Sequence, residues 1–198
     1  MSRVGNKIIQ IPNGAKVEFA DQTVKVTGSN GTVLTQEIKS PITVVVNSAT
    51  VEVKRQGDEN TTKALHGLYN RLIQNMITGV TAGFTKTLIL NGVGYKAAMK
   101  GENLSLALGM SHPCEVKAEP GVKFKVCTPQ EVQALNLGKE GISAVVQVSG
   151  ANREKVGAVA SKIRDLRKVE PYHLYGIRYS NEHIARKESK SGAKGKKK

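Results

Sequence analysis

The chain has 198 residues, 39% of them hydrophobic, and a formal net charge of +14 at pH 7. This length fits one large domain or two small ones, and the charge favours a negatively charged partner. Apolar runs such as Val44–Val46 are far too short to cross a bilayer, and the first residues contain no apolar signal region, so we expect a cytoplasmic protein without a membrane partner.

The first half of the chain begins with residues that alternate between apolar and polar, which is the period of a half-buried strand. Asn30-Gly31 has the sequence of a type I′ hairpin turn, because both residues tolerate a positive φ. Runs of β-branched residues predict a second hairpin. The strands expected here are Lys16–Phe19, Thr23–Thr27, Thr32–Ile38, Ile42–Val46 and Thr50–Lys54.

The period then changes to that of an amphipathic helix. Residues 58–60 suit its first turn, where free N–H groups and partial positive charge gather, and Gly79 is expected to end it. The predicted apolar face consists of Leu65, Leu68, Tyr69, Leu72 and Met76.

Strands and one helix follow again in the second half. The strands expected are Thr87–Leu90, Tyr95–Lys100, Leu104–Leu108, Val122–Val126 and Ala144–Val148. Asn152 is a plausible N-cap for the second helix, whose predicted apolar face is Val156, Val159, Ala160, Ile163 and Leu166. The segment Pro129–Gly141 fits neither half, and it is either a short helix capped by Thr128 and Glu131 or a loop insertion.

The two halves repeat the same order of elements. Val51 and Val53 match Val146 and Val148 at a constant shift, and the apolar residues of the two helices match in the same way. The sequence therefore predicts an α+β fold of two similar tandem domains, an internal duplication in which one helix covers one face of a mainly antiparallel sheet. The expected boundaries are 1–82 and 83–170 for the domains and 171–198 for a basic C-terminal tail.

Motifs for enzyme chemistry are weak. Residues 92–97, GVGYKA, match a loose dinucleotide fingerprint, which requires a helix directly after it. Gly101 interrupts the segment where that helix would have to form. A glycine-kinked strand is the better interpretation, with Tyr95 and Lys96 either contacting RNA or pairing across the sheet. The cysteines and histidines show no metal-ligand spacing, and His112 is more simply a turn former than a general base. We expect no enzyme activity, no cofactor and no small-molecule substrate.

The strongest signal lies near the C-terminus. The last 37 residues carry 12 Lys or Arg and 4 Asp or Glu, which is a net charge of +8 out of +14, and they contain three of the five tyrosines in EPYHLYGIRY, residues 170–179. Cations neutralise phosphates while rings and guanidinium planes stack on bases, so nucleic acid is the favoured partner. A solvated, disordered tail or a tail that binds membrane surfaces or acidic proteins is the alternative.

Three stretches resemble one known family: SRVGNKIIQIP, LNGVGYKAAMKGENLSLALGMSHP, and the C-terminal run that begins IRDLRKVEPYHLYGIRY. The chain resembles large-subunit ribosomal protein six of the bacterial type, along essentially its whole length. The resemblance implies a duplicated α+β fold and a structural constituent of the large ribosomal subunit. It further implies binding to 23S rRNA mainly through the second domain and tail, near the translation-factor site and the sarcin–ricin loop, with ribosomal proteins as neighbours and translation factors nearby.

Carried over by position, the family's C-terminal signature falls on Glu170, Pro171, Tyr172, Gly176, Ile177, Arg178 and Tyr179, and its middle motif on Lys96, Ser111, His112 and Pro113. The sequence departs from the family at His173-Leu174-Tyr175, where a Lys-Gly-Lys-type run is usual, and at the apparent insertion Pro129–Gly141. The RNA contacts expected are Lys96, His112, Lys162, Arg164, Arg167, Lys168, Tyr172, His173, Tyr175, Arg178, Tyr179, His183, Arg186, Lys187, Lys190 and Lys194.

Two rival functions remain at this point. The first is a nicotinamide-dependent oxidoreductase that uses GVGYKA. The second is a free polyanion-binding module that docks acidic proteins or membrane surfaces through its tail.

Overall fold

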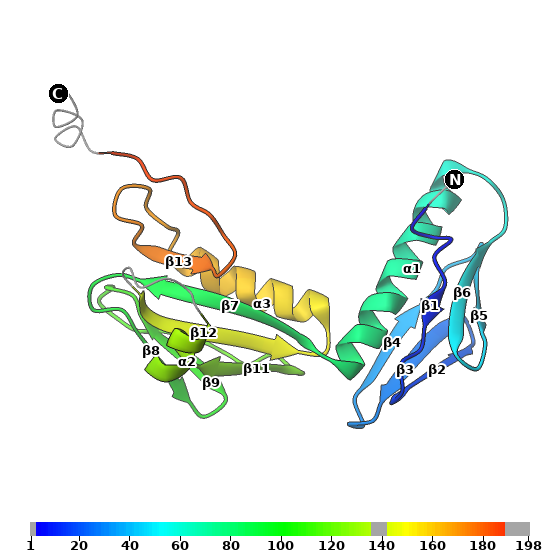
Figure 1. The fold of residues 1–198 in the computed structure, drawn as a ribbon, viewed down its shortest axis with the longest axis horizontal. Helices are drawn as coiled ribbons and strands as arrows, with labels where there is room; N and C mark the ends of the chain where they lie inside the picture. The colour runs from blue at the N-terminus through cyan, green and yellow to red at the C-terminus, as the bar shows by residue number, and fades with distance from the viewer. Residues whose placement is uncertain (1–2, 136–141, 189–198) are drawn as a thin grey trace. The chain divides into compact units, whose positions relative to one another are not determined.

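The computed structural model describes residues 3–135 and 142–188 (Figure 1). The chain divides into two compact units. The first contains the residues up to Phe84 together with Ala151–Arg153, and the second contains Thr85–Gly150 together with the residues from Glu154 onward.

The first unit packs strands against one helix, α1 (Asn60–Thr81). One sheet has the order β2-β3-β4 and the other the order β1-β6-β5, with antiparallel pairing in both. Val24, Val51 and Ile73 are fully buried between the strands and the helix, which is why the alternating strands form here (Figure 1). The strands are β1 (Ile9–Gln10), β2 (Ala15–Ala20), β3 (Thr23–Gly28), β4 (Val33–Glu37), β5 (Ile42–Val46) and β6 (Thr50–Arg55).

The face that α1 buries differs from the predicted one. Tyr69 and Met76 are buried as expected, but Leu68 is 51% exposed. Three polar side chains, Thr62, His66 and Asn70, are buried on this helix instead. Asn70 is fully paired, whereas His66 Nδ1 is buried without a hydrogen-bond partner among the described residues. His66 Nε2 lies 2.8 Å from the Val53 carbonyl oxygen, and Asn70 Nδ2 donates to the carbonyl oxygens of residues 5 and 7 at 3.0 and 2.8 Å. These bonds orient the helix, because a buried amide is stable only with its partners.

The prediction that Gly79 ends α1 is also wrong. The helix continues to Thr81, and Gly79 lies inside it. A Cβ at Gly79 would lie 2.0 Å from the Ala151 carbonyl oxygen, so glycine is required by close backbone packing and not by a helix end.

The second unit contains a four-stranded sheet of order β11-β12-β7-β13 and a three-stranded sheet of order β10-β9-β8. Its main helix, α3 (Arg153–Leu166), buries Val156, Val159, Ala160 and Ile163 as predicted. The predicted fold class, duplicated α+β with mainly antiparallel sheets, is confirmed. The strands are β7 (Phe84–Asn91), β8 (Lys96–Lys100), β9 (Asn103–Ala107), β10 (Cys114–Val116), β11 (Val122–Val126), β12 (Ile142–Gly150) and β13 (Gly176–Tyr179).

The segment after β11 begins with a short helix, α2 (Pro129–Ala134). Of the two predicted alternatives, the capped helix is the one that forms. Glu131 N donates to the Thr128 side chain, and Thr128 N donates to Glu131 Oε2 at 2.9 Å, which completes a capping box. The rest of the predicted insertion, residues 136–141, lies outside the described residues.

Residues 92–95 form a turn between β7 and β8, so the expectation of a glycine-kinked strand is wrong. Gly94 has a φ of +76°, which a turn needs and an L-residue rarely adopts. The next element is the strand β8, not a helix. A dinucleotide fingerprint requires a helix N-terminus at this position, and the geometry for it is therefore missing.

The segment predicted to be a tail contributes a strand to the sheet. β13 pairs antiparallel with β7, with Gly176 opposite Asn91 and Tyr179 opposite Leu88. Ile177 is fully buried, which anchors this strand in the core. The backbone of residues 176–179 is therefore held in the sheet of the second unit.

Candidate nucleic-acid interface

A closed loop lies between α3 and β13, and we call Glu170–Tyr175 the aromatic loop. Leu174 N donates to the Glu170 carbonyl oxygen at 3.0 Å, and Glu170 N donates to that of Tyr175 at 2.9 Å. Asn91 Nδ2 donates to the Leu174 carbonyl oxygen at 3.0 Å and fixes the loop to the end of β7. The loop is thus a built structure with a defined position on the sheet.

Gly176 makes the exit from this loop possible. Its φ is +139°, and a Cβ there would lie 2.7 Å from the Lys168 carbonyl oxygen. Ile177 N donates to the Arg167 carbonyl oxygen at 2.9 Å, so the chain after α3 and the start of β13 lie directly against each other. Only glycine fits this crossing without displacing backbone.

The rings of the aromatic loop lie on the surface. His173 and Tyr175 stack, with ring centroids 5.5 Å apart and an interplanar angle of 21°. Tyr172 is 45% exposed and Tyr175 is 40% exposed. Exposed, stacked aromatic side chains in a rigid loop are suited to further stacking by a flat base.

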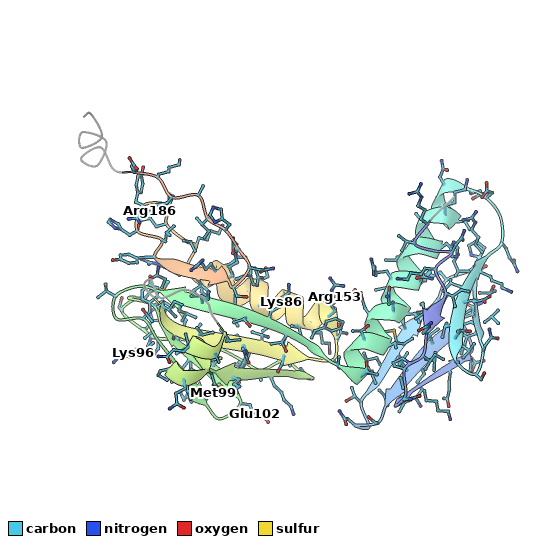
Figure 2. The ribbon with its side chains drawn as sticks, in the orientation of Figure 1. Lys86, Lys96, Met99, Glu102, Arg153 and Arg186 are labelled. Atoms are coloured by element: carbon cyan, nitrogen blue, oxygen red, sulfur yellow. The ribbon has the colours of Figure 1, made fainter. Side chains whose placement is uncertain are left out.

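The chain after β13 folds back onto this loop, and we call residues 180–188 the return segment. Lys187 N donates to the Pro171 carbonyl oxygen at 3.0 Å, and Arg186 Nε donates to that of Tyr172 at 3.2 Å. Figure 2 shows Arg186 on this segment. These bonds bring the cations of the return segment next to the exposed rings.

Arg164, Tyr179 and Glu182 form a cluster that we call the clasp. Arg164 Nε donates to Glu182 Oε2 at 3.0 Å, its Nη2 donates to Oε1, and Tyr179 N also donates to Oε2, at 3.2 Å. The guanidinium lies 5.9 Å from the centroid of the Tyr179 ring, and Lys86 Nζ lies 5.7 Å from it. The clasp fastens the return segment to α3.

The charges of the clasp stabilise one another. The hydrogen bond from Arg164 holds the pKa of Glu182 below its ordinary value, and the same bond raises the pKa of Arg164. Burial raises the pKa of Tyr179, which keeps its hydroxyl protonated. Arg164 is therefore engaged inside the protein, and its predicted role as a phosphate contact competes with a structural one.

Other predicted cations differ in how free they are. Lys162 Nζ lies 2.6 Å from Glu119 Oε1, but this pair is exposed and exposed pairs contribute little, so phosphate can replace the carboxylate. Arg167 and Lys168 are exposed and form no ion pair with any described residue. Arg178 Nε is buried and has no hydrogen-bond partner in the described part of the chain.

Arg167, Lys168 and Tyr175 come together around one cavity of about 520 Å³, which we call the loop cavity. The turn at residues 92–95 and the chain at Leu108 and Gly109 complete its walls. Three predicted RNA contacts from the chain between α3 and β13 thus line a single hollow.

The remaining predicted contacts lie elsewhere on the second unit. Lys96 is exposed on β8 (Figure 2), and His112 is exposed in the turn between β9 and β10. No side-chain hydrogen bond or ion pair links either of them to the aromatic loop among the described residues. His183 is exposed on the return segment, whereas Lys190 and Lys194 lie outside the described residues.

Sequence reasoning missed the parts that hold this surface together. Glu182 was not singled out, although an acid within a basic segment is a signal for an internal partner. Asn91 gave no signal, because its partner is a backbone carbonyl far away in the sequence. Tyr95 was noted beside its glycines, but its place in the wall of the loop cavity was not.

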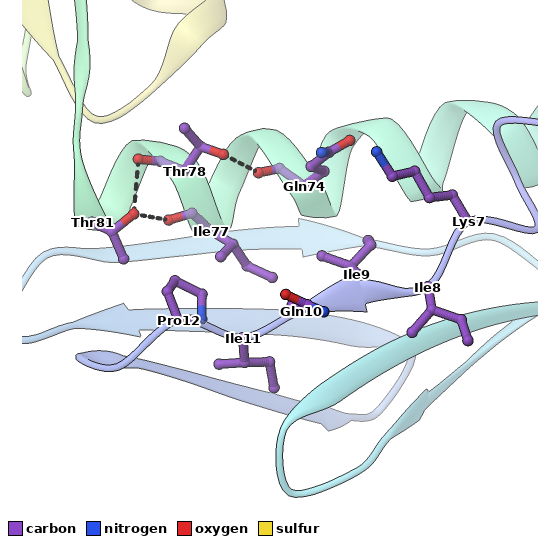
Figure 3. A pocket seen from close by; sticks show the side chains of 10 residues that line it. All are labelled: Lys7, Ile8, Ile9, Gln10, Ile11, Pro12, Gln74, Ile77, Thr78 and Thr81. Atoms are coloured by element: carbon purple, nitrogen blue, oxygen red, sulfur yellow. Dashed lines mark hydrogen bonds between the residues drawn. The ribbon is translucent and has the colours of Figure 1, made fainter.

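The first unit has a hollow of another character, of about 580 Å³, between β1 and α1 (Figure 3). Its lining is mostly Ile, Gln and Thr, and Thr78 and Thr81 donate their hydroxyl hydrogens to carbonyl oxygens of α1. Lys7 is the only charged side chain in this lining, which consists of described residues, and the lining contains no aromatic ring. It lacks the groups that recognise RNA.

None of the described helices is long and apolar enough to span a membrane. No group of three or more His, Cys, Asp or Glu side chains in that part of the chain is arranged to hold a metal ion.

The family model for ribosomal protein L6 matches the chain twice, over residues 11–83 and 91–180. The two matches fall on the two halves, which confirms the predicted duplication. A large ribosomal subunit protein uL6 of Clostridium botulinum is 46% identical, with 98% of this chain and 100% of that protein covered. The uL6 proteins of Acidothermus cellulolyticus (45% identical; 97% and 99% covered) and Moorella thermoacetica (43%; 100% of both) are similarly related.

Proposed function

The chain belongs to the ribosomal protein L6 family, and from this premise we propose that it is a structural constituent of the large ribosomal subunit that binds 23S rRNA through its second unit. The family is one of ribosomal proteins and not of enzymes, which removes the oxidoreductase alternative. Assembly into ribosomes also accounts for the expected cytoplasmic location.

The aromatic loop and the return segment carry this proposal. They place exposed rings and exposed cations side by side on a surface that backbone hydrogen bonds and the clasp already hold in shape. Lys and Arg neutralise phosphates and release counterions, while Tyr172 and Tyr175 stack on bases. A surface that is ordered before binding loses little conformational entropy when RNA arrives.

The predicted contacts then have different roles. Arg167, Lys168 and Lys187 meet phosphates directly, and Lys162 does so by exchanging Glu119 for a phosphate oxygen. Arg164 acts by positioning the return segment. Stacking by His173 and Tyr175 takes the place of the basic run that is usual in the family. Lys96 and His112 contribute a second, separate contact region.

The location close to the translation-factor site, next to the sarcin–ricin loop, is part of the same proposal. It can be tested with iron-EDTA tethered to the variant Tyr172→Cys, in which Cys114 and Cys127 are replaced by Ser. Hydroxyl radicals should cut 23S rRNA around the sarcin–ricin loop in assembled subunits. Cuts confined to distant helices would refute the location and leave rRNA binding intact.

The competing function is a free module that binds acidic proteins or membranes by charge alone. It predicts that anionic liposomes or an acidic protein displace 23S rRNA from the protein at physiological salt when charge is matched. Our proposal predicts that neither competes, because stacking and shape add specificity that charge does not supply. Displacement at matched charge would favour the free module.

A further inference from the structure

We propose that the loop cavity receives a single extruded nucleotide of the rRNA, with its base inside the cavity and its phosphate between Arg167 and Lys168. This inference rests on the proposed function, since it names the feature of the RNA that the surface recognises. The proposal requires the rRNA to present one unstacked base at a fixed place, which neutralisation of phosphates and stacking on surface rings do not require.

The size and floor of the cavity fit a flat group. Its volume of about 520 Å³ lies within the range of small-molecule sites, roughly 300–1,000 Å³. Tyr95 and Leu108 are buried and form a firm apolar wall. A Cβ at Gly92 would lie 2.6 Å from the Tyr95 ring, so that ring packs directly on glycine backbone. Gly92 therefore lets the Tyr95 ring pack against the turn and form part of the cavity wall.

Two exposed apolar side chains lie at the cavity, beside its charged groups. Val93, in the turn, is 84% exposed, and Tyr175, which also lines the cavity, is 40% exposed. His173 stacks on Tyr175 and restricts its ring. A base that entered beside Tyr175 would therefore extend an existing stack of two rings.

Charge assigns the orientation of the nucleotide. Arg167 and Lys168 line the cavity without a carboxylate partner among the described residues, so they are available to a phosphate. Glu170 also lines it, and its carboxylate repels phosphate but accepts hydrogen bonds from amino groups of a base. The backbone of Arg167 and Lys168 is fixed by the crossing at Gly176, which sets the points from which the two side chains reach the cavity.

A duplex cannot satisfy this site. The bases of an A-form helix are stacked and paired, and its deep major groove does not admit side chains. Proteins that read a base inside a pocket act on single strands or take the base out of the stack. The cavity is thus suited to a bulged or looped nucleotide and not to a helical segment.

The test is ultraviolet cross-linking of intact ribosomes that contain the full-length protein, followed by digestion and mass spectrometry. A nucleotide adduct on Tyr175 or Tyr95 supports the proposal. Adducts on Tyr172 and the return segment without any on the cavity tyrosines would overturn it while leaving rRNA binding in place. No adduct anywhere on the chain, together with loss from the subunit, would overturn the proposed function as well.

Dimethyl sulfate probing of 23S rRNA in the same ribosomes gives a second readout. Tyr175→Ala should raise the reactivity of one base about tenfold, from lost stacking, while Tyr175→Phe should keep that base protected. Tyr172→Ala removes the other exposed tyrosine ring of the same loop and should raise the reactivity of a different base, not of this one. An unchanged reactivity profile in Tyr175→Ala would refute the cavity site, and a profile in which Tyr172→Ala exposes the same base would do so too.

Discussion

Removing the charge of Glu182 should loosen the return segment without unfolding the protein. Glu182 receives two hydrogen bonds from Arg164 and one from the backbone of Tyr179. Charge-assisted bonds contribute roughly 1.5–3 kcal/mol when shielded. The side chains of Arg164 and Glu182 are 34% and 24% exposed, so solvent screening reduces the contribution of these bonds. We expect Glu182→Gln to lower the free energy of opening the return segment by about 1–2 kcal/mol.

Native-state hydrogen exchange measures this loss directly. The amides of Ser180 and Lys187 donate to carbonyl oxygens of β7 and the aromatic loop, and they are exposed only when the return segment opens. In Glu182→Gln their protection should fall about 5- to 30-fold, while Val146, deep in the sheet, should keep its protection. The control Glu102→Gln removes the same charge from an exposed turn and should change neither (Figure 2).

The effect of pH has a definite sign. The Glu182 pKa is lower in the folded chain than its ordinary value of 4.5, because Arg164 donates to it. Its contribution is therefore complete above about pH 4.5 and is lost as the pH falls through the lower, folded pKa. Protection at Ser180 should decline over that acid range in the wild type and not in Glu182→Gln. Equal protection in the two proteins near neutral pH would refute the role of the clasp.

Three further outcomes are expected. Gly176→Ala should lower the free energy of unfolding in urea by about 2–3 kcal/mol, because the new Cβ would meet backbone atoms at a residue with positive φ. The control Gly157→Ala, which has open space around it in α3, should be neutral or stabilising. Equal effects of the two substitutions would contradict the crossing geometry at Gly176. Asn70→Ala should lower the free energy of unfolding by about 2–3 kcal/mol, because it leaves two backbone carbonyls unpaired, and Leu68→Ala should lower it by less than about 1 kcal/mol. The reverse order in urea unfolding would show that the face predicted from the sequence is the buried one. Lys187→Ala should reduce the slope of the logarithm of the rRNA-binding constant against the logarithm of salt concentration by about 0.9 in magnitude. An unchanged slope would show that this lysine does not contact a phosphate.

Patterns that act within a few residues predicted the local structure well. Alternation identified the strands around Thr23–Thr27, and the Thr128–Glu131 pair indicated a capped helix. The face of α1 was misjudged because hydropathy ranks Leu68 above Asn70. In the structure the Asn70 amide donates to two backbone carbonyls, while Leu68 is 51% exposed.

The candidate site shows the same limit. The rings and cations of residues 170–179 were visible in the sequence, since they are unusual in a chain with few aromatic residues. The pairing of β13 with β7, the bond between Arg164 and Glu182, and the wall that Tyr95 gives the loop cavity all join distant residues. No local pattern encodes such contacts, because they depend on how the chain folds back on itself.

Sedimentation of a cell extract through a high-salt gradient, with this protein followed by antibody, tests the central claim most directly. High salt weakens binding that depends on charge alone, because counterion release no longer favours it. We predict that the protein stays with the large ribosomal subunit in stoichiometric amount. If it instead runs free near the top of the gradient, its proposed place in the large subunit is wrong, and charge-driven binding to acidic proteins or membranes becomes the better account.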